Sequence, residues 1–190
     1  VVLTSTERAV LVDGTVSVNA IATDAGGNAS PAGTSHFSLD TSAPNAPVLA
    51  LGTGVSGGAT AAEATASTGV VTLTAESGAS VVVTFTDAAN PAHTVSKTVI
   101  GNGTTPVAVV LSSAERAVLV DGTVSVSAVA TDSAGNASNA GVVSFTLDTQ
   151  APATPSAPAS YQDNVGNTTG NASTAATTDD TTPGVQVGRS

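Results

Sequence analysis

Residues 109–152 read VVLSSAERAVLVDGTVSVSAVATDSAGNASNAGVVSFTLDTQAP, and residues 1–44 read VVLTSTERAVLVDGTVSVNAIATDAGGNASPAGTSHFSLDTSAP. The two stretches are identical at 32 of 44 positions without a gap, and equivalent positions lie 108 residues apart. A period of about 100 residues has the length of a whole domain and is too long for one turn of a solenoid. The repeat therefore predicts an array of similar modules.

Apolar and polar residues alternate within each copy, as they do in half-buried β-strands. In residues 122–131, for example, Val124, Val126 and Ala128 alternate with Ser and Thr. Segments of this kind predict seven strands, at residues 47–51, 71–75, 81–85, 94–100, 106–111, 122–131 and 143–147. Seven short strands in about 100 residues are typical of an immunoglobulin-like β-sandwich. Helix signals are weak, and only the alanine-rich residues 59–67 are expected to add a helical turn.

The predicted fold class is all-β, with tandem immunoglobulin-like β-sandwich modules arranged end to end. Residues 1–44 would be the C-terminal half of a module plus a linker, and residues 45–149 a complete module. Residues 150–190 would be a linker and the N-terminal part of a third, divergent module, contributing at most an early strand. The linkers at 40–47 and 148–155 each contain two prolines. Proline restricts its own φ and keeps the preceding residue extended, so we expect stiff linkers and a monomeric rod.

The composition argues against several classes of function. The chain has 14 acidic residues and four Lys plus Arg, so its formal net charge of −10 repels nucleic-acid phosphates. No apolar run approaches the roughly 18 residues of a membrane span, so we expect no membrane insertion of this segment. The sequence has no Cys, no P-loop and no nucleophile elbow, and its two histidines, His36 and His93, occupy unrelated positions. We therefore expect no enzymatic activity.

The string DGTVSVSAVATDSAGNAS…FTLDTQAP resembles the bacterial immunoglobulin-like repeats of giant surface adhesins, the biofilm-associated and RTX-type proteins exported by type I secretion. The resemblance covers nearly the whole chain. It implies a secreted, cell-surface location and a role as an extracellular spacer that holds a ligand-binding tip away from the cell. It also implies that calcium at the module junctions stiffens the array.

The segments TDAGGN and TDSAGN contain the candidate metal ligands Asp24, Asn28, Asp132 and Asn136. Asp, Gly and Asn favour turns whether or not a ligand is bound, so these residues can be read as turn residues alone. They can also be read as calcium ligands, because calcium selects carboxylate and carbonyl oxygens.

Topology supports the calcium interpretation. In a seven-strand sandwich, the loop between the last two strands lies at the end where the chain enters the module, and the last strand leaves at the opposite end. Asp40 of the first copy should therefore approach Asp132 and Asn136 of the second. With the family resemblance added, we expect calcium at this junction. The corresponding half-sites, which would face neighbouring modules, are Asp24 with Asn28, and Asp148.

Two classes of function remain open. The segment is either a structural extender of an adhesin active in cell adhesion or biofilm formation, or a module that itself binds a glycan or host-surface ligand. Carbohydrate sites usually present exposed aromatic rings. Only Tyr161 is an aromatic other than Phe, and Phe37, Phe85 and Phe145 are expected to face inward. These observations and the near-identical repetition favour the extender.

Overall fold

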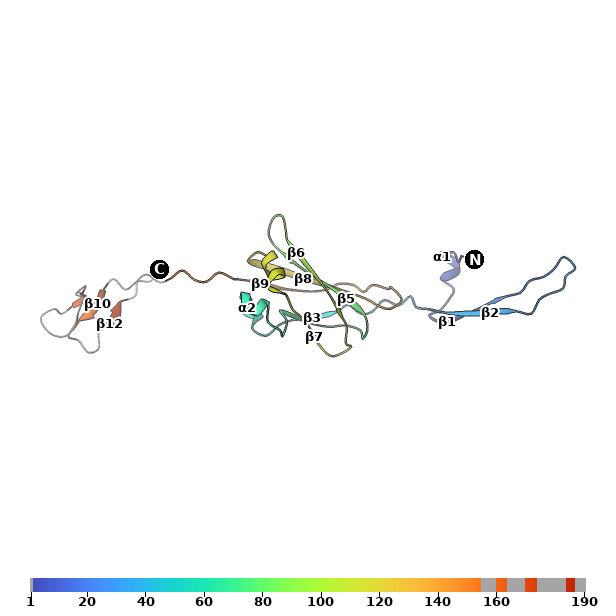
Figure 1. The fold of residues 1–190 in the computed structure, drawn as a ribbon, viewed down its shortest axis with the longest axis horizontal. Helices are drawn as coiled ribbons and strands as arrows, with labels where there is room; N and C mark the ends of the chain where they lie inside the picture. Colours follow the sequence, from blue (N-terminus) through green and yellow to red (C-terminus); the bar gives the residue numbers. More distant parts are fainter. Residues whose placement is uncertain (1, 155–159, 164–169, 174–183, 187–190) are drawn as a thin grey trace. The chain divides into compact units, whose positions relative to one another are not determined.

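The computed structural model describes residues 2–154 and the strands at 160–163, 170–173 and 184–186 (Figure 1). The chain divides into two compact units, Val1–Thr149 and Gln150–Ser190. The first unit contains a seven-stranded sandwich, preceded by a separate two-stranded sheet. The second unit contains a small three-stranded sheet.

The sandwich is built from two antiparallel sheets, which confirms the predicted all-β sandwich fold. One sheet has the order β3-β4-β7 and the other the order β6-β5-β8-β9. The strands are β3 (Val48–Leu51), β4 (Val71–Thr74), β5 (Ser80–Asp87), β6 (Thr94–Ile100), β7 (Val107–Val109), β8 (Gly122–Thr131) and β9 (Gly141–Leu147). All seven lie where the alternation predicts them. The fourth strand of the sandwich, β6, pairs with the third, β5. In the constant-type immunoglobulin fold, the fourth strand lies instead in the sheet that does not contain the third.

The core lies between the two sheets and follows the two-residue period. Along β5, Val81, Val83 and Phe85 are fully buried, while Val82 between them is 46% exposed. Along β8, the side chains of Val124 and every second residue after it are buried in the same way. The core consists mainly of valine and alanine side chains, and the β-branched valines fit the pleat of the strands.

The first repeat copy forms only a hairpin, β1 (Gly14–Ala20) with β2 (Gly33–Leu39). Its register matches that of β8 with β9, since Val16 faces Phe37 as Val124 faces Phe145. Phe145 is 5% exposed, whereas Phe37 is 42% exposed. The expectation that Phe37 faces a core is therefore wrong here, because no second sheet among the described residues covers this hairpin.

Short helices occur at places where the alternation has no signal for them. The helices α1 (Ser5–Arg8) and α3 (Ser113–Val118) were not expected, whereas α2 (Ala61–Ala64) lies within the expected helical turn; a 3₁₀ turn, η1, spans Val55–Gly57. Each α-helix begins with a capping box, in which a Ser or Thr and a Glu three residues later satisfy each other's backbone N–H. The capping box is therefore the local sequence signal that predicts these helices.

The second unit differs from its prediction. In place of at most one early strand, it has β10 (Ser160–Asp163), β11 (Gly170–Ser173) and β12 (Gly184–Gln186) in the order β11-β10-β12. Both pairings are antiparallel. The strands read SYQD, GNAS and GVQ, and these segments contain too few apolar residues for an apolar–polar alternation to be recognised.

Candidate inter-module junction

The loop after β8 is closed by hydrogen bonds between Asp132 and Asn136. Asp132 Oδ1 accepts from the backbone N–H groups of Ala134 and Asn136, both at 2.9 Å. Asp132 Oδ2 accepts from the Asn136 side-chain amide at 2.9 Å. The Asn136 hydrogen bonds are the main reason why the pKa of Asp132 lies below its ordinary value. The loop is therefore a self-contained turn that fixes the orientation of the Asn136 amide.

The first copy contains the same loop. Asp24 Oδ1 accepts from the N–H groups of Gly26 and Asn28, and Asp24 Oδ2 accepts from the Asn28 amide, each at 2.9 Å. The pKa of Asp24 is lowered for the same reason. The turn therefore forms in both copies from its own residues alone.

In the second copy this loop also contacts the incoming linker. Asn136 Nδ2 donates to the backbone carbonyl of Asp40 at 3.1 Å, across 96 residues of sequence. The Asp40 carboxylate itself accepts from the Ser42 N–H at 3.1 Å. The structure thus brings Asp40 next to the Asp132–Asn136 loop through its backbone carbonyl.

The linker then packs against the sandwich. Both of its prolines, Pro44 and Pro47, are buried, although residues around them are exposed. A Cβ atom built on Gly141, the first residue of β9, would overlap the Pro47 carbonyl oxygen and lie 3.0 Å from its carbonyl carbon. A Cβ on the equivalent Gly33 would meet only the Ala20 carbonyl oxygen, at 3.8 Å. Glycine at 141 therefore allows the linker to approach β9 closely.

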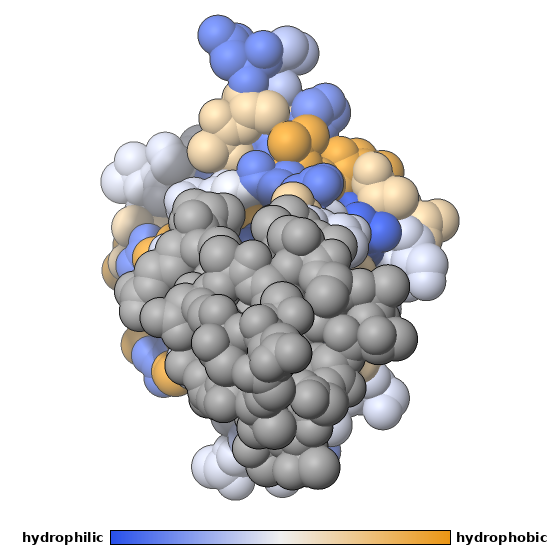
Figure 2. All heavy atoms as spheres, turned by 90° about the vertical axis from the view of Figure 1, so that its left-hand side faces the viewer, coloured by the Kyte–Doolittle hydropathy of each residue, from blue (hydrophilic) through white to orange (hydrophobic). Residues whose placement is uncertain are grey.

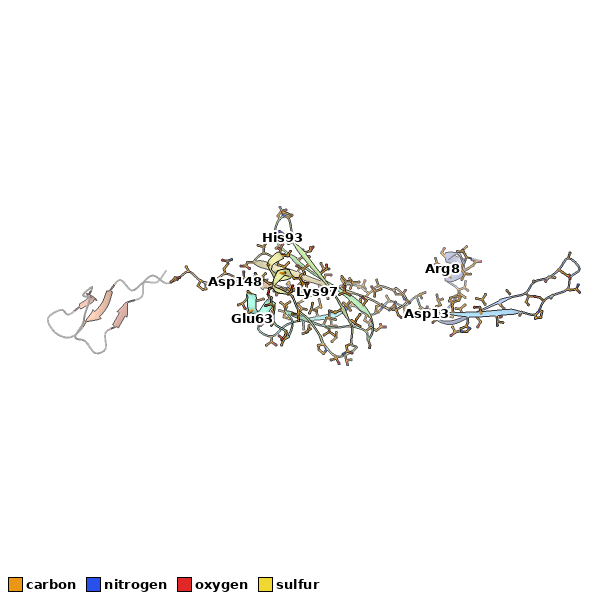
Figure 3. All side chains as sticks on the ribbon, in the orientation of Figure 1. Arg8, Asp13, Glu63, His93, Lys97 and Asp148 are labelled. Carbon is orange, nitrogen blue, oxygen red and sulfur yellow. The ribbon has the colours of Figure 1, made fainter. Side chains whose placement is uncertain are left out.

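The other side of the linker is tied to the first copy by Asp13, which lies where the hairpin ends (Figure 3). Asp13 Oδ1 accepts from the N–H (3.0 Å) and hydroxyl (2.8 Å) of Thr41, and Asp13 Oδ2 accepts from the Ser42 hydroxyl (2.7 Å). The Ser42 and Thr41 hydrogen bonds lower the pKa of Asp13. In the second copy Asp121 accepts from Thr149 in the same way.

The residues that hold the linker were only partly anticipated. Asp13 and Asp121 look like turn residues in the sequence, because each precedes a glycine and a strand. The repeat contains the missing signal, since both residues of each pair, Asp13 with Thr41 and Asp121 with Thr149, are identical in the two copies. The contact of Pro47 with Gly141 has no comparable signal.

The oxygens at the junction are of the kind that calcium prefers. Asp132 Oδ2 and the Asp40 carbonyl oxygen both accept from one nitrogen, at 2.9 and 3.1 Å, so both point toward the same position. Among the described residues, no three His, Asp or Glu side chains are grouped closely enough to hold a metal ion. A calcium ion would therefore need carbonyl, amide or water oxygens in addition to carboxylates.

The remaining predicted ligand, Asp148, lies at the opposite end of the sandwich from Asp132. Its backbone N–H donates to the Ala59 carbonyl at 2.9 Å, near Glu63 (Figure 3). The structure does not bring Asp148 together with Asp40 or Asp132, as expected for a residue at the other end of the module.

A buried carboxylate, Asp87, joins two segments near that same end. It is 4% exposed and accepts from the N–H groups of Ala89, His93 and Val120 and from His93 Nδ1, at 2.8–3.1 Å. The hydrogen bond from the His93 N–H is the largest of the effects that hold the pKa of Asp87 well below its ordinary value. The carboxylate is fully engaged in hydrogen bonds and connects the β5–β6 hairpin to the segment before β8.

Within the part of the chain that the structure describes, no helix has the length and apolar character needed to cross a membrane.

No protein-family model and no curated protein matches this chain. Among solved structures, it is similar to a tetra-tandem repeat in the extending region of a large adhesion protein, with 30% identity over 73% of this chain and a TM-score of 0.42. It is also similar to a 1.5-MDa bacterial ice-binding adhesin, with 20% identity over 83% of this chain and a TM-score of 0.35. The chain spans 32% of the first structure and 47% of the second. Both of these similar structures come from large adhesins.

Proposed function

We propose that this chain is a spacer segment in the extracellular stalk of a large bacterial adhesin, where it projects a distal ligand-binding region. The observation that carries the proposal is the linker at residues 40–47, which is held on both sides. Asp13 binds its start from the first copy, and Asn136 binds the Asp40 carbonyl from the second. The burial of both linker prolines adds packing to these hydrogen bonds. A linker held in this way transmits the direction of one module to the next.

The character of the surface supports a spacer over a ligand-binding module. On the part of the described surface that is visible in Figure 2, apolar and polar residues lie side by side in small areas. Two grooves lie at equivalent places on β1–β2 and on β5–β8–β9. Ser and Thr line both, together with Asn19 and His36 in the first and three Val in the second. The side chains of Phe, Tyr and Trp, the usual anchors of glycans, are not among the lining residues of these two grooves.

We further propose that calcium binds at the junction and strengthens it. Asp132, Asn136 and Asp40 would hold the ion, with carboxylate, amide and carbonyl oxygens as ligands. The equivalent residues Asp24 and Asn28, and Asp148 at the other end, would serve junctions with neighbouring modules. The bound cation would link oxygens of two modules. Because extracellular calcium modules bind at roughly 10⁻⁴–10⁻³ M, such a junction would be filled outside the cell.

The spacer proposal can be tested by distance measurements on the whole chain. The sequence contains no cysteine, so Ser35→Cys and Ser144→Cys, both exposed, introduce two unique spin-label sites on the two sides of the linker. We expect a narrower distance distribution than in a control whose residues 41–47 are replaced by Gly and Ser. Equal widths in the two proteins would refute the stiff-spacer proposal.

The calcium proposal is tested in the same labelled protein by comparing the distance distributions with calcium and with a chelator. Millimolar calcium should narrow the distribution relative to a chelator, and Asp40→Ala together with Asp132→Ala should remove this response. An unchanged wild-type distribution would show that calcium does not act at this junction, and would leave the spacer proposal standing.

A further inference from the structure

The Asn136 side chain occupies a particular place in the junction. Its amide nitrogen lies between two oxygens that belong to different modules, Asp132 Oδ2 at 2.9 Å and the Asp40 carbonyl at 3.1 Å. An amide NH₂ group has two protons, so it can satisfy both oxygens at once. Its orientation is set by the closed turn, because the Asn136 backbone N–H also donates to Asp132.

We infer that Asn136 is a positioning residue that holds the linker on the module without any metal, and that its amide and a calcium ion are alternative ways to join the same two oxygens. This inference rests on the proposed spacer function. It adds that the junction has two ordered states, one made by the amide and one by the cation. The linker would then remain partly docked when calcium is absent.

The chemistry of the site explains why the residue is asparagine. A carboxylate at this position would place a second negative charge beside Asp132 and would offer no proton to the Asp40 carbonyl. A serine has only one proton to donate, so it can join only one of the two oxygens. The first copy shows that the turn itself does not depend on the linker, since Asn28 and Asp24 make the same hydrogen bonds within their own loop.

The same comparison supplies a matched control. Asn28→Asp changes an equivalent turn and costs the same intraloop hydrogen bond, but the hydrogen bonds of Asn28 in the structure lie within its own loop. Asn136→Asp changes the turn and also removes the donor to Asp40. Any difference between the two variants therefore reports on the contact with the linker.

The test uses the doubly labelled full chain in chelator. Loss of one hydrogen bond should lower the ratio of docked to undocked linker roughly 2- to 13-fold, so Asn136→Asp should broaden the distance distribution while Asn28→Asp leaves it unchanged. Asn136→Ala should broaden it equally. Addition of calcium should restore the narrow distribution in Asn136→Asp, in which a carboxylate replaces the amide oxygen as a ligand, but less in Asn136→Ala, which offers no side-chain ligand at this position.

The inference is overturned if Asn136→Asp keeps the wild-type distribution in chelator, or if Asn28→Asp broadens it as much. Circular dichroism of each variant identifies one that has failed to fold, and in that case the comparison of Asn136→Ala with Asn28→Ala decides. These outcomes differ from failure of the spacer proposal, in which the wild type is already as broad as the Gly/Ser control. They also differ from failure of the calcium proposal, in which only the response to calcium is missing.

Discussion

Gly141→Ala should destabilise the sandwich, whereas Gly33→Ala at the equivalent position of the first copy should not. Both glycines begin equivalent strands, and neither has a left-handed φ, so the backbone tolerates alanine at both. The difference lies in the space beside them. The new Cβ at 141 overlaps the Pro47 carbonyl group, whereas the new Cβ at 33 meets only one oxygen at an ordinary van der Waals distance.

The size of the effect follows from this overlap. Extra atoms in a packed site cost about 1–3 kcal/mol, while Gly→Ala at a compatible site contributes about 0.4–1 kcal/mol of stability. For a domain of this size, each kcal/mol corresponds to about 4–8 °C in the unfolding temperature. We therefore expect Gly141→Ala to unfold at a clearly lower temperature than the wild type, and Gly33→Ala to unfold at the same temperature or slightly higher.

Differential scanning calorimetry, together with far-UV circular dichroism, measures these transitions. The distance distribution across the linker should broaden in Gly141→Ala, because Pro47 must move away from β9. If Gly141→Ala and Gly33→Ala unfold at the same temperature, the close approach of the linker does not contribute to stability, and the reasoning from the Pro47 contact is refuted.

Three further predictions concern the sandwich. Phe145→Ala should cost about 3–5 kcal/mol in denaturant unfolding and Phe37→Ala far less, because only the first is buried; equal costs would mean that the hairpin has a covering partner. The pKa of Asp87 is lower in the folded state than in the unfolded chain, so the unfolded chain binds protons more readily as the pH falls. The unfolding temperature should therefore drop between about pH 4 and pH 2, and it should drop less steeply in Asp87→Asn. An equal dependence of the unfolding temperature on pH in the two proteins would contradict this. Ser112→Ala should lower stability by about 1 kcal/mol through loss of the α3 cap, measured by urea unfolding, and an unchanged midpoint would show that the cap is dispensable.

The strands were predictable because their signal is local. Val81, Val83 and Phe85 alternate with polar or exposed positions, and in a strand that alternation directly sets which side chains face the core. The α3 helix was missed because a six-residue helix contains less than two turns, too few for a 3.6-residue period to appear. Its capping box was the only local signal. The three strands of the second unit were missed because their segments, SYQD, GNAS and GVQ, contain too few apolar residues to alternate with polar ones.

The sequence predicts which residues meet at the candidate site, but not which of their atoms make the contact. The repeat and the direction of the strands place Asp40 near the loop of Asp132 and Asn136, and the structure shows the hydrogen bond between Asn136 and the Asp40 carbonyl. From the sequence, the side chains of these residues were expected to supply oxygens to a cation. That the Asn136 nitrogen joins the two modules could not be predicted, because the direction of a side-chain amide depends on its neighbours in space.

The sequence by itself determined the repeat, which follows from direct comparison of the two copies. It also determined the strand pattern and the turn formed by each Asp and Asn pair, since these depend on residues close together in the chain. Only the tertiary structure decided which atoms meet across the junction. The carbonyl of Asp40 reaches Asn136, and that of Pro47 reaches Gly141, because sheet pairing and the path of the linker bring together residues more than 90 positions apart. A hydrogen bond or a close packing contact requires a fit within a few tenths of an ångström, and no local pattern specifies distances of that kind.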